Sequence, residues 1–218
     1  MPDEKRTARP LAHRIAVRTA HVLFERGQLA TAPRRELSEL GLDADDRQGY
    51  APTGWFFLRR ALRGVRIGAE DVFVDFGSGM GRVVLHVARR YPARRVVGIE
   101  LAPELTSVAQ QNLARQRERL RCRDVELVTG DVATFTVPDD MTVAYLYNPF
   151  TDDLFRTVLT RIGQSLDRAP RDLTLVYVNP QLAADVVATG RFVHVRTSRP
   201  RRASGVDRWA STYRSVRQ

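Results

Sequence analysis

The stretch 72-VFVDFGSGMGRVV-84 decides how the middle of this chain folds. An apolar run reaches Asp75 and is followed by Gly77, Gly79 and Gly81, and then by further aliphatic residues. Glycine weakens any regular element that it interrupts, but it accepts backbone angles that a Cβ forbids and lets the backbone lie close to a ligand. The pattern predicts a strand, a tight turn and a helix, with the turn serving either packing alone or the binding of a ligand.

From residue 72 onward, apolar runs alternate with segments of helical character. Strands are predicted at Val72–Phe76, Arg95–Glu100, Val125–Thr129, Val143–Tyr147, Leu173–Val178, Phe192–Thr197 and Trp209–Ser215. Helices are predicted at Gly81–Tyr91, Pro103–Leu120, Asp152–Asp167 and Gln181–Ala188. Near-continuous apolar strands are typical of a parallel sheet that helices cover on both faces. Only 198-SRPRRASGVD-207 separates the last two strands, which predicts a hairpin with a basic tip. The predicted fold class is therefore α/β: a doubly wound, mostly parallel sheet of seven strands with a C-terminal antiparallel hairpin.

The first part of the chain reads as a helical segment, so we place a boundary between residues 1–66 and a core domain at 67–218. Within it, 53-TGWFFLRRALRGV-65 predicts a helix with Thr53 as a candidate N-cap and Gly64 as its terminator.

Composition limits the function classes. No apolar run approaches the ~18 residues that span a bilayer, the one cysteine excludes an internal disulfide, and no Cys/His cluster has metal-binding spacing. We therefore expect a cytoplasmic protein without a structural metal. The net charge of +10 lies at the two ends of the chain. Residues 1–70 carry 13 basic and 9 acidic side chains, residues 71–180 carry 14 of each, and residues 181–218 carry 8 and 2. Because only one of the 35 basic residues is a lysine, the excess of arginine points to a compositional bias as much as to a nucleic-acid partner.

Acidic and polar residues end the first four predicted strands. Glu100 ends the second strand, and an acidic residue there suits a grip on the two hydroxyls of a ribose. Asp131 follows the third strand, where a carboxylate can accept a hydrogen bond from an exocyclic amine. Asn148 and Phe150 follow the fourth strand. Since parallel strands share one carboxyl edge, these residues are expected to line one site.

With these residues in place, the chain resembles the class I S-adenosylmethionine-dependent methyltransferases over roughly residues 67–218, with distant similarity to the seven-strand histone-lysine methyltransferases. The resemblance implies S-adenosyl-L-methionine as the cofactor. It makes 75-DFGSGMG-81, with Asp75, Gly77, Ser78, Gly79 and Gly81, the loop that faces the amino-acid part of the cofactor. It also implies Glu100 and Leu101 at the ribose, Asp131 and Val132 beside the adenine, and Asn148-Pro149-Phe150 between the methyl group and the acceptor.

The segment 50-YAPTGW-55 lies just before the core. By resemblance to the histone-lysine methyltransferases, Tyr50 and Thr53 belong to a loop that folds over the cofactor and excludes water. The alternative makes Pro52 a turn residue and Thr53 a helix cap, and the sequence leaves both open.

Methyl transfer needs alignment more than it needs a protein nucleophile, and alignment can supply ~7–11 kcal/mol. We expect Asn148 to orient the acceptor, Phe150 to form an apolar or stacking wall, and Tyr147 to be a further catalytic candidate. Enzymes that methylate adenine or glutamine nitrogen have Asn/Asp-Pro-Pro-aromatic at this motif, and this chain is one proline short, so we do not carry that acceptor over. A nitrogen of a protein, peptide or small metabolite is the favoured acceptor.

Two alternatives stay open on the sequence. One is an RNA methyltransferase that uses Arg199, Arg201, Arg202 and Arg208 of the hairpin to contact phosphates. The other is a Rossmann module that is non-catalytic or binds a nicotinamide cofactor, against which the G-x-G-x-G spacing argues.

Overall fold

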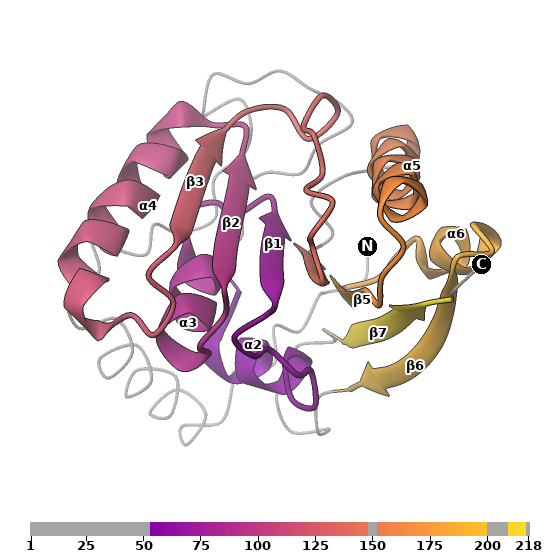
Figure 1. The fold of residues 1–218 in the computed structure, drawn as a ribbon, viewed down its shortest axis with the longest axis horizontal. Coiled ribbons are helices and arrows are strands. Elements are labelled where there is room, and N and C mark those ends of the chain that lie inside the picture. The colour runs from indigo at the N-terminus through magenta and orange to yellow at the C-terminus, as the bar shows by residue number, and fades with distance from the viewer. Residues whose placement is uncertain (1–52, 148–151, 200–208, 217–218) are drawn as a thin grey trace, which may run out of the picture.

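Seven strands form one sheet in the order β3-β2-β1-β4-β5-β7-β6 (Figure 1). The strands are β1 (Val72–Phe76), β2 (Arg95–Glu100), β3 (Val125–Thr129), β4 (Val143–Tyr147), β5 (Thr174–Val178), β6 (Phe192–Ser198) and β7 (Ala210–Ser215). The first five are parallel, and β7 lies antiparallel between β5 and β6. This confirms the predicted fold class, with strand bounds within one residue of those expected.

The computed structural model describes residues 53–147, 152–199 and 209–216. The helices predicted before residue 53, the tip of the hairpin at 200–208, and the residues Tyr50, Asn148 and Phe150 lie outside these ranges. The boundary between residues 66 and 67 therefore stays a prediction. Among the described residues, no helix combines the length and the apolar character that crossing a membrane requires.

Helices cover both faces of the sheet. They are α2 (Trp55–Ala61), α3 (Arg82–Arg90), α4 (Pro103–Gln116) with a short 3-10 turn at Arg117–Arg119, α5 (Asp152–Arg168) and α6 (Ala183–Ala188). Helices α2 and α3 share one buried cluster with Phe73 of β1, whereas α5 and α6 share the opposite cluster with Val72 and Val74. Because alternate residues of β1 face opposite layers, all five of its residues are buried.

Several helix ends differ from the prediction: α4 ends at Gln116 instead of Leu120, α6 begins at Ala183 instead of Gln181, and α2 differs at both ends. Helix α2 is shorter than residues 53–65, and Gly54, not Thr53, is its N-cap residue, with no side-chain cap. Thr53 is instead buried, at 4% exposure. The chain leaves α2 through Gly64, whose φ of 80° is the left-handed conformation expected of a terminating glycine.

Gly98 in the middle of β2 brings helix and sheet together. A Cβ at this position would lie 2.7 Å from Val84 Cγ2 of α3 and 2.9 Å from both Ser78 Cβ and Ser78 Oγ. A side chain of any size would push α3 and the loop before it away from the sheet. The glycine therefore sets the position of the 77–81 loop at the edge of the sheet where β1 and β2 end.

Candidate functional site

The loop after β1 closes with three glycines in the left-handed conformation. Gly77, Gly79 and Gly81 have φ values of 84°, 54° and 76°. The N–H groups of Gly77 and Ser78 both donate to the Ile99 carbonyl oxygen at 2.9 Å, which ties the loop to β2. A Cβ on Gly81 would lie 2.9 Å from Ala109 Cβ of α4. The sequence needs glycine here because both the backbone angles and the close approach of α4 exclude a side chain.

Glu100 connects the end of β2 to the glycine loop. Its Oε2 accepts a hydrogen bond from the Gly79 N–H at 2.8 Å, and its Oε1 accepts one from the Ala102 N–H at 3.0 Å. Burial raises the pKa of Glu100, and these backbone hydrogen bonds partly offset the rise. The carboxylate is thus held beside the loop, with Leu101 half-buried after it.

Asp75 is a buried carboxyl group beneath the same loop. Its side chain is 2% exposed, and its Oδ2 has no hydrogen-bond partner among the described residues. Burial first, and then the negative charge of Glu100, raise the pKa of Asp75 well above its usual range. An unsatisfied buried carboxyl group is costly, so its presence indicates a role beyond packing.

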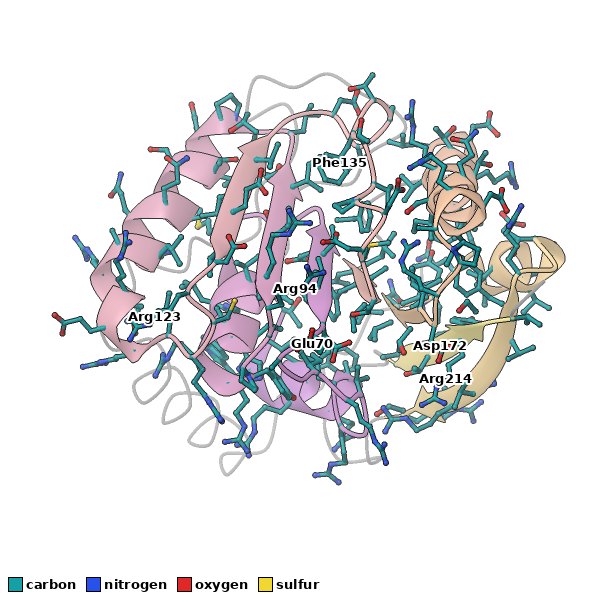
Figure 2. All side chains as sticks on the ribbon, in the orientation of Figure 1. Glu70, Arg94, Arg123, Phe135, Asp172 and Arg214 are labelled. Carbon is teal, nitrogen blue, oxygen red and sulfur yellow. The ribbon has the colours of Figure 1, made fainter. Side chains whose placement is uncertain are left out.

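Asp131 begins the tight turn that follows β3. Its Oδ1 accepts from the Ala133 N–H at 2.8 Å, and its carbonyl oxygen accepts from the Phe135 N–H at 2.9 Å. Val132 is buried in the apolar layer beside α5. Phe135, which we did not predict as a site residue, packs edge-on against Phe76 at 6.2 Å between ring centroids and lies on the side toward which the arrowheads of β2 and β3 point (Figures 1 and 2). Its position in a turn that directly follows a candidate residue was the available signal.

The segment before α2 reaches the glycine loop through Arg82. The Arg82 Nη1 donates to the Thr53 carbonyl oxygen at 2.9 Å, and its guanidinium carbon lies 5.2 Å from the centre of the Trp55 ring. Thr53 also faces the buried hydroxyl of Tyr145 on β4, and Tyr145 is the register partner of Asp75. The structure therefore places Thr53 against Tyr145, whose strand neighbour is Asp75, and it adds Arg82 and Tyr145 to the residues that the sequence singled out.

The strand order separates this sheet from a dinucleotide-binding one. The dinucleotide fold has the order 3-2-1-4-5-6, whereas here an antiparallel β7 is inserted between β5 and β6. The sequence model of the family described as "Histone methylation protein DOT1" matches residues 46–133, which include the 77–81 loop, Glu100 and Asp131. This match and the fold support a class I S-adenosylmethionine-dependent methyltransferase.

Curated relatives of the methyltransferase match short parts of it. An H3 lysine-79 specific histone-lysine N-methyltransferase of Drosophila melanogaster is 40% identical over 53 residues, 24% of this chain and 3% of that protein. A protein-lysine N-methyltransferase of Saccharolobus islandicus (strain REY15A) is 29% identical over 66 residues, 30% of this chain and 41% of that protein. The matches thus span less than half the length of either relative.

Solved structures share the fold over most of the methyltransferase. An RNA methyltransferase from Salinibacter ruber, in complex with S-adenosyl-L-homocysteine, has a TM-score of 0.53 and 24% identity over 77% of this chain and 95% of that chain. A SAM-dependent methyltransferase from Aquifex aeolicus has a TM-score of 0.57 and 10% identity over 73% and 89%. At these identities the likeness is one of fold.

The residues present fit S-adenosylmethionine, which is the cofactor of this site. Asp75 offers an unpartnered buried carboxyl oxygen, the three glycines leave the loop without side chains that would fill the space, and Glu100 places a carboxylate at the end of the next strand. The strand order, with β7 inserted between β5 and β6, argues against a nicotinamide cofactor.

The residues predicted to face the acceptor lie at and after the end of β4. Tyr147 is half-buried and packs against the apolar layer beside α2 and α3. Asn148 and Phe150 follow it outside the described residues. The catalytic roles predicted for all three stay predictions.

Proposed function

We propose that the protein transfers a methyl group from S-adenosylmethionine to a nitrogen atom of a protein, and that this nitrogen is the ε-amine of a lysine. The observation that carries the proposal is the match to the DOT1 family over residues 46–133. This range begins ahead of α2 and ends after Asp131 and Val132, so it includes the segment before the core as well as the cofactor loop. That both curated relatives are protein-lysine methyltransferases supports the same acceptor.

Each cofactor-side residue has a proposed task. The loop at 77–81 and Asp75 face the amino-acid part of the cofactor, and Glu100 with Leu101 faces the ribose. Asp131 and Val132 flank the adenine, and Tyr50 and Thr53 cover the site from the upstream segment. The contact of Thr53 with Arg82, which follows the glycine loop directly, supports this last role.

On the acceptor side, the protein must present a neutral amine in line with the reacting bond. When bound, S-adenosylmethionine supplies an electrophilic methyl group whose leaving group departs without charge. A lysine amine has to lose its proton before it attacks, and a dry apolar wall lowers the pKa of an amine. We assign this wall to Phe150 and Tyr147, and we assign to Asn148 a hydrogen bond that accepts from the amine and orients it. Alignment of this kind is worth about 7–11 kcal/mol of the barrier.

Labelled methyl transfer tests the acceptor. The purified protein is incubated with methyl-tritiated S-adenosylmethionine and a cell lysate, which is then separated into protein, RNA and small molecules. We expect label in protein, recovered as methylated lysine after acid hydrolysis, and none when Glu100→Ala replaces the wild type. Label confined to RNA, to small molecules, or to another amino acid would overturn the lysine assignment.

A second candidate is an RNA acceptor, and one surface of the described chain favours it. Arg59, Arg89 and Arg90 all lower the pKa of His86 after its burial, and the charge of Arg119 lowers the pKa of Arg89 after burial, so these four cations lie close together. Within the described ranges none of them forms a salt bridge. Of the hairpin arginines, only Arg199 is described, and its carbonyl oxygen accepts from Arg60 Nη1 at 2.9 Å.

This second candidate makes a distinct prediction. RNA binding through phosphate contacts should weaken by roughly tenfold or more between 50 and 200 mM salt. A binding constant that ignores salt over this range, or no RNA binding at 50 mM salt, would exclude it. We also propose a cytoplasmic location for the protein. The one thiol of the sequence, Cys122, is buried and forms no disulfide, which fits a reducing compartment.

A further inference from the structure

Two buried polar side chains lie next to each other beneath the glycine loop. Asp75 on β1 and Tyr145 on β4 are register partners in a parallel strand pair, so both side chains leave the same face of the sheet. Asp75 is 2% exposed and Tyr145 is fully buried. Among the described residues, neither Asp75 Oδ2 nor the Tyr145 hydroxyl has a hydrogen-bond partner.

The surroundings of this pair are apolar except on the side of the upstream segment. The Tyr145 ring packs against Phe73, with 6.1 Å between centroids, within the buried cluster that also holds Trp55. Thr53 is close enough to the Tyr145 hydroxyl to favour its ionised form slightly, but the contact does not reach hydrogen-bond geometry. The pair is therefore enclosed by α2, α3 and the glycine loop.

A tyrosine at this position lowers the stability of the folded protein relative to a phenylalanine. Phenylalanine would fill the same volume, as Phe73 does two residues away from Asp75 on the same face of β1. A buried hydroxyl without a partner destabilises the folded protein, and so does a buried carboxyl oxygen without one. We therefore expect both groups to form hydrogen bonds in at least one state of the protein. The cofactor site is next to them, so cofactor binding is the event that can supply these bonds.

We propose that Tyr145 is a positioning residue for cofactor binding: its hydroxyl donates a hydrogen bond to the Asp75 carboxylate when that carboxylate binds the ammonium group of S-adenosylmethionine. The inference rests on the cofactor site and not on the identity of the acceptor. Asp75 gives up its proton to solvent when the ammonium arrives, and the Tyr145 hydroxyl then stabilises the charge from below. No proton moves between the two side chains.

The electrostatics of the pair agree with this division of roles. Burial and then the charge of Glu100 raise the pKa of Asp75, and burial and then the charge of Asp75 raise the pKa of Tyr145 well above its usual range. Tyr145 therefore keeps its proton and remains a donor. Among the described residues, Tyr147 from β4 and Arg82 from α3, which contacts Thr53, also lie near the pair.

The test compares wild type with Tyr145→Phe, which keeps the ring and removes the donor. The Kd of S-adenosylhomocysteine is measured by calorimetry from pH 5 to pH 9. We expect binding 5- to 20-fold weaker at neutral pH, and we expect the pH below which affinity is lost to move upward, because the carboxylate has lost a stabilising donor. The melting temperature without ligand should stay the same or rise. Tyr213→Phe, a buried tyrosine on β7, is the matched control and should change neither the Kd nor the pH profile.

A double-mutant cycle separates positioning from packing. If Tyr145 acts through Asp75, then Tyr145→Phe added to Asp75→Asn should weaken binding less than twofold further. The full loss repeated in the Asp75→Asn background would assign Tyr145 a merely structural role. An unchanged Kd and pH profile in Tyr145→Phe would overturn the proposal. So would a wild-type protein that does not bind S-adenosylhomocysteine, in which case the cofactor assignment falls as well. Protein methylation by Tyr145→Phe with a normal Kd would overturn only the present inference.

Discussion

Polar side chains at the two edges of the sheet differ in whether their hydrogen bonds are satisfied within the protein. At the carboxyl edge, where the parallel strands end, Asp75 Oδ2 and the Tyr145 hydroxyl are buried without hydrogen-bond partners among the described residues. At the amino edge, the half-buried guanidinium of Arg171, just before β5, donates to the carbonyl oxygens of Met141 at 2.5 Å, Ser165 at 2.9 Å and Ala169 at 2.7 Å. In Figure 2, Phe135 lies in the upper part of the molecule, and Asp172, the residue after Arg171, lies below its middle.

This contrast indicates that the hydrogen bonds around Arg171 contribute to stability, whereas the polar groups around Asp75 serve function. Arg171 also donates to the Ser165 hydroxyl at 2.7 Å, and Ser165 in turn donates to the Pro138 carbonyl oxygen at 3.1 Å, so these two side chains are satisfied within the protein. Partly satisfied polar groups destabilise a fold unless another molecule completes them. We infer that the carboxyl edge is completed by the cofactor, and that changes at the two edges should have separable effects.

The largest expected effect is on stability, at the amino edge. Arg171→Met keeps the apolar stem but removes the donors to several carbonyl groups, so we expect the free energy of unfolding in urea to fall by about 3 kcal/mol. The Kd of S-adenosylhomocysteine should stay within about twofold under conditions where the variant is folded. A loss of stability below about 1 kcal/mol would show that this edge is less important than its hydrogen bonds indicate.

The next effect is on binding, at the carboxyl edge. Glu100→Gln keeps an acceptor for the Gly79 N–H but loses the negative charge, so we expect S-adenosylhomocysteine to bind about 30-fold more weakly, or roughly 2 kcal/mol. Calorimetry measures the Kd, and Glu126→Gln, an exposed residue of β3, is the control that should bind normally. Equal affinity in Glu100→Gln and wild type would mean that Glu100 serves only to hold the loop.

A third change tests the packing that positions the carboxyl edge. Gly98→Ala places a Cβ 2.7 Å from Val84 Cγ2 and 2.9 Å from Ser78. We expect a loss of about 1–2 kcal/mol in unfolding free energy, together with weaker cofactor binding because Ser78 is displaced. Gly68→Ala, whose Cβ would meet only Asp71 Oδ2 at 3.7 Å, should stay within about 0.5 kcal/mol of wild type. Normal affinity in Gly98→Ala would show that the loop tolerates the shift.

The last expected effect is on the pH dependence of stability, through His86 of α3, which contacts Trp55 of α2. Burial, followed by the charges of Arg59, Arg90 and Arg89, lowers the pKa of His86 to about 4, and its ring lies 5.9 Å from that of Trp55. The folded protein thus binds fewer protons here than the unfolded chain, whose histidine titrates near 6.5. Stability from this group is present above that pH and is lost as pH falls toward 4.

From pH 7 to pH 5 we expect wild type to lose about 2 kcal/mol of unfolding free energy relative to His86→Gln, since each pH unit is worth at most about 1.4 kcal/mol. Asp75 contributes with the opposite sign, because its raised pKa makes the folded protein bind more protons. Comparing the two proteins isolates His86. Parallel curves for wild type and His86→Gln would contradict the lowered pKa.

The sequence predicted the sheet well because apolar runs bounded by glycine or charge leave little freedom in a parallel strand. It also predicted that Glu100 and Asp131 share one edge, since the ends of parallel strands meet there. Tyr145 was not identified, because an aromatic residue inside an apolar run looks like ordinary core. Its role depends on the neighbouring strand, which the register of β1 and β4 alone reveals.

The helix ends were harder to predict for a similar reason. Thr53 has the chemistry of an N-cap, yet it lies buried against Tyr145 and Arg82, and Gly54 occupies the capping position. Arg82 is a charged residue that directly follows the glycine loop, and its burial beneath Trp55 follows from tertiary packing. Such contacts override local preferences and cannot be read from spacing.

The most direct measurement is a calorimetric titration of wild type and Asp75→Asn with S-adenosylhomocysteine at pH 7.5, with the melting temperature of each protein taken without ligand. Our account predicts saturable binding by wild type, binding weaker by about 100-fold in the variant, and a melting temperature in the variant that is equal or higher, because a buried unpartnered carboxyl group has been removed. Equal binding by the two proteins, or a variant that loses stability and affinity together, would contradict the claim that this carboxyl group is kept for the cofactor.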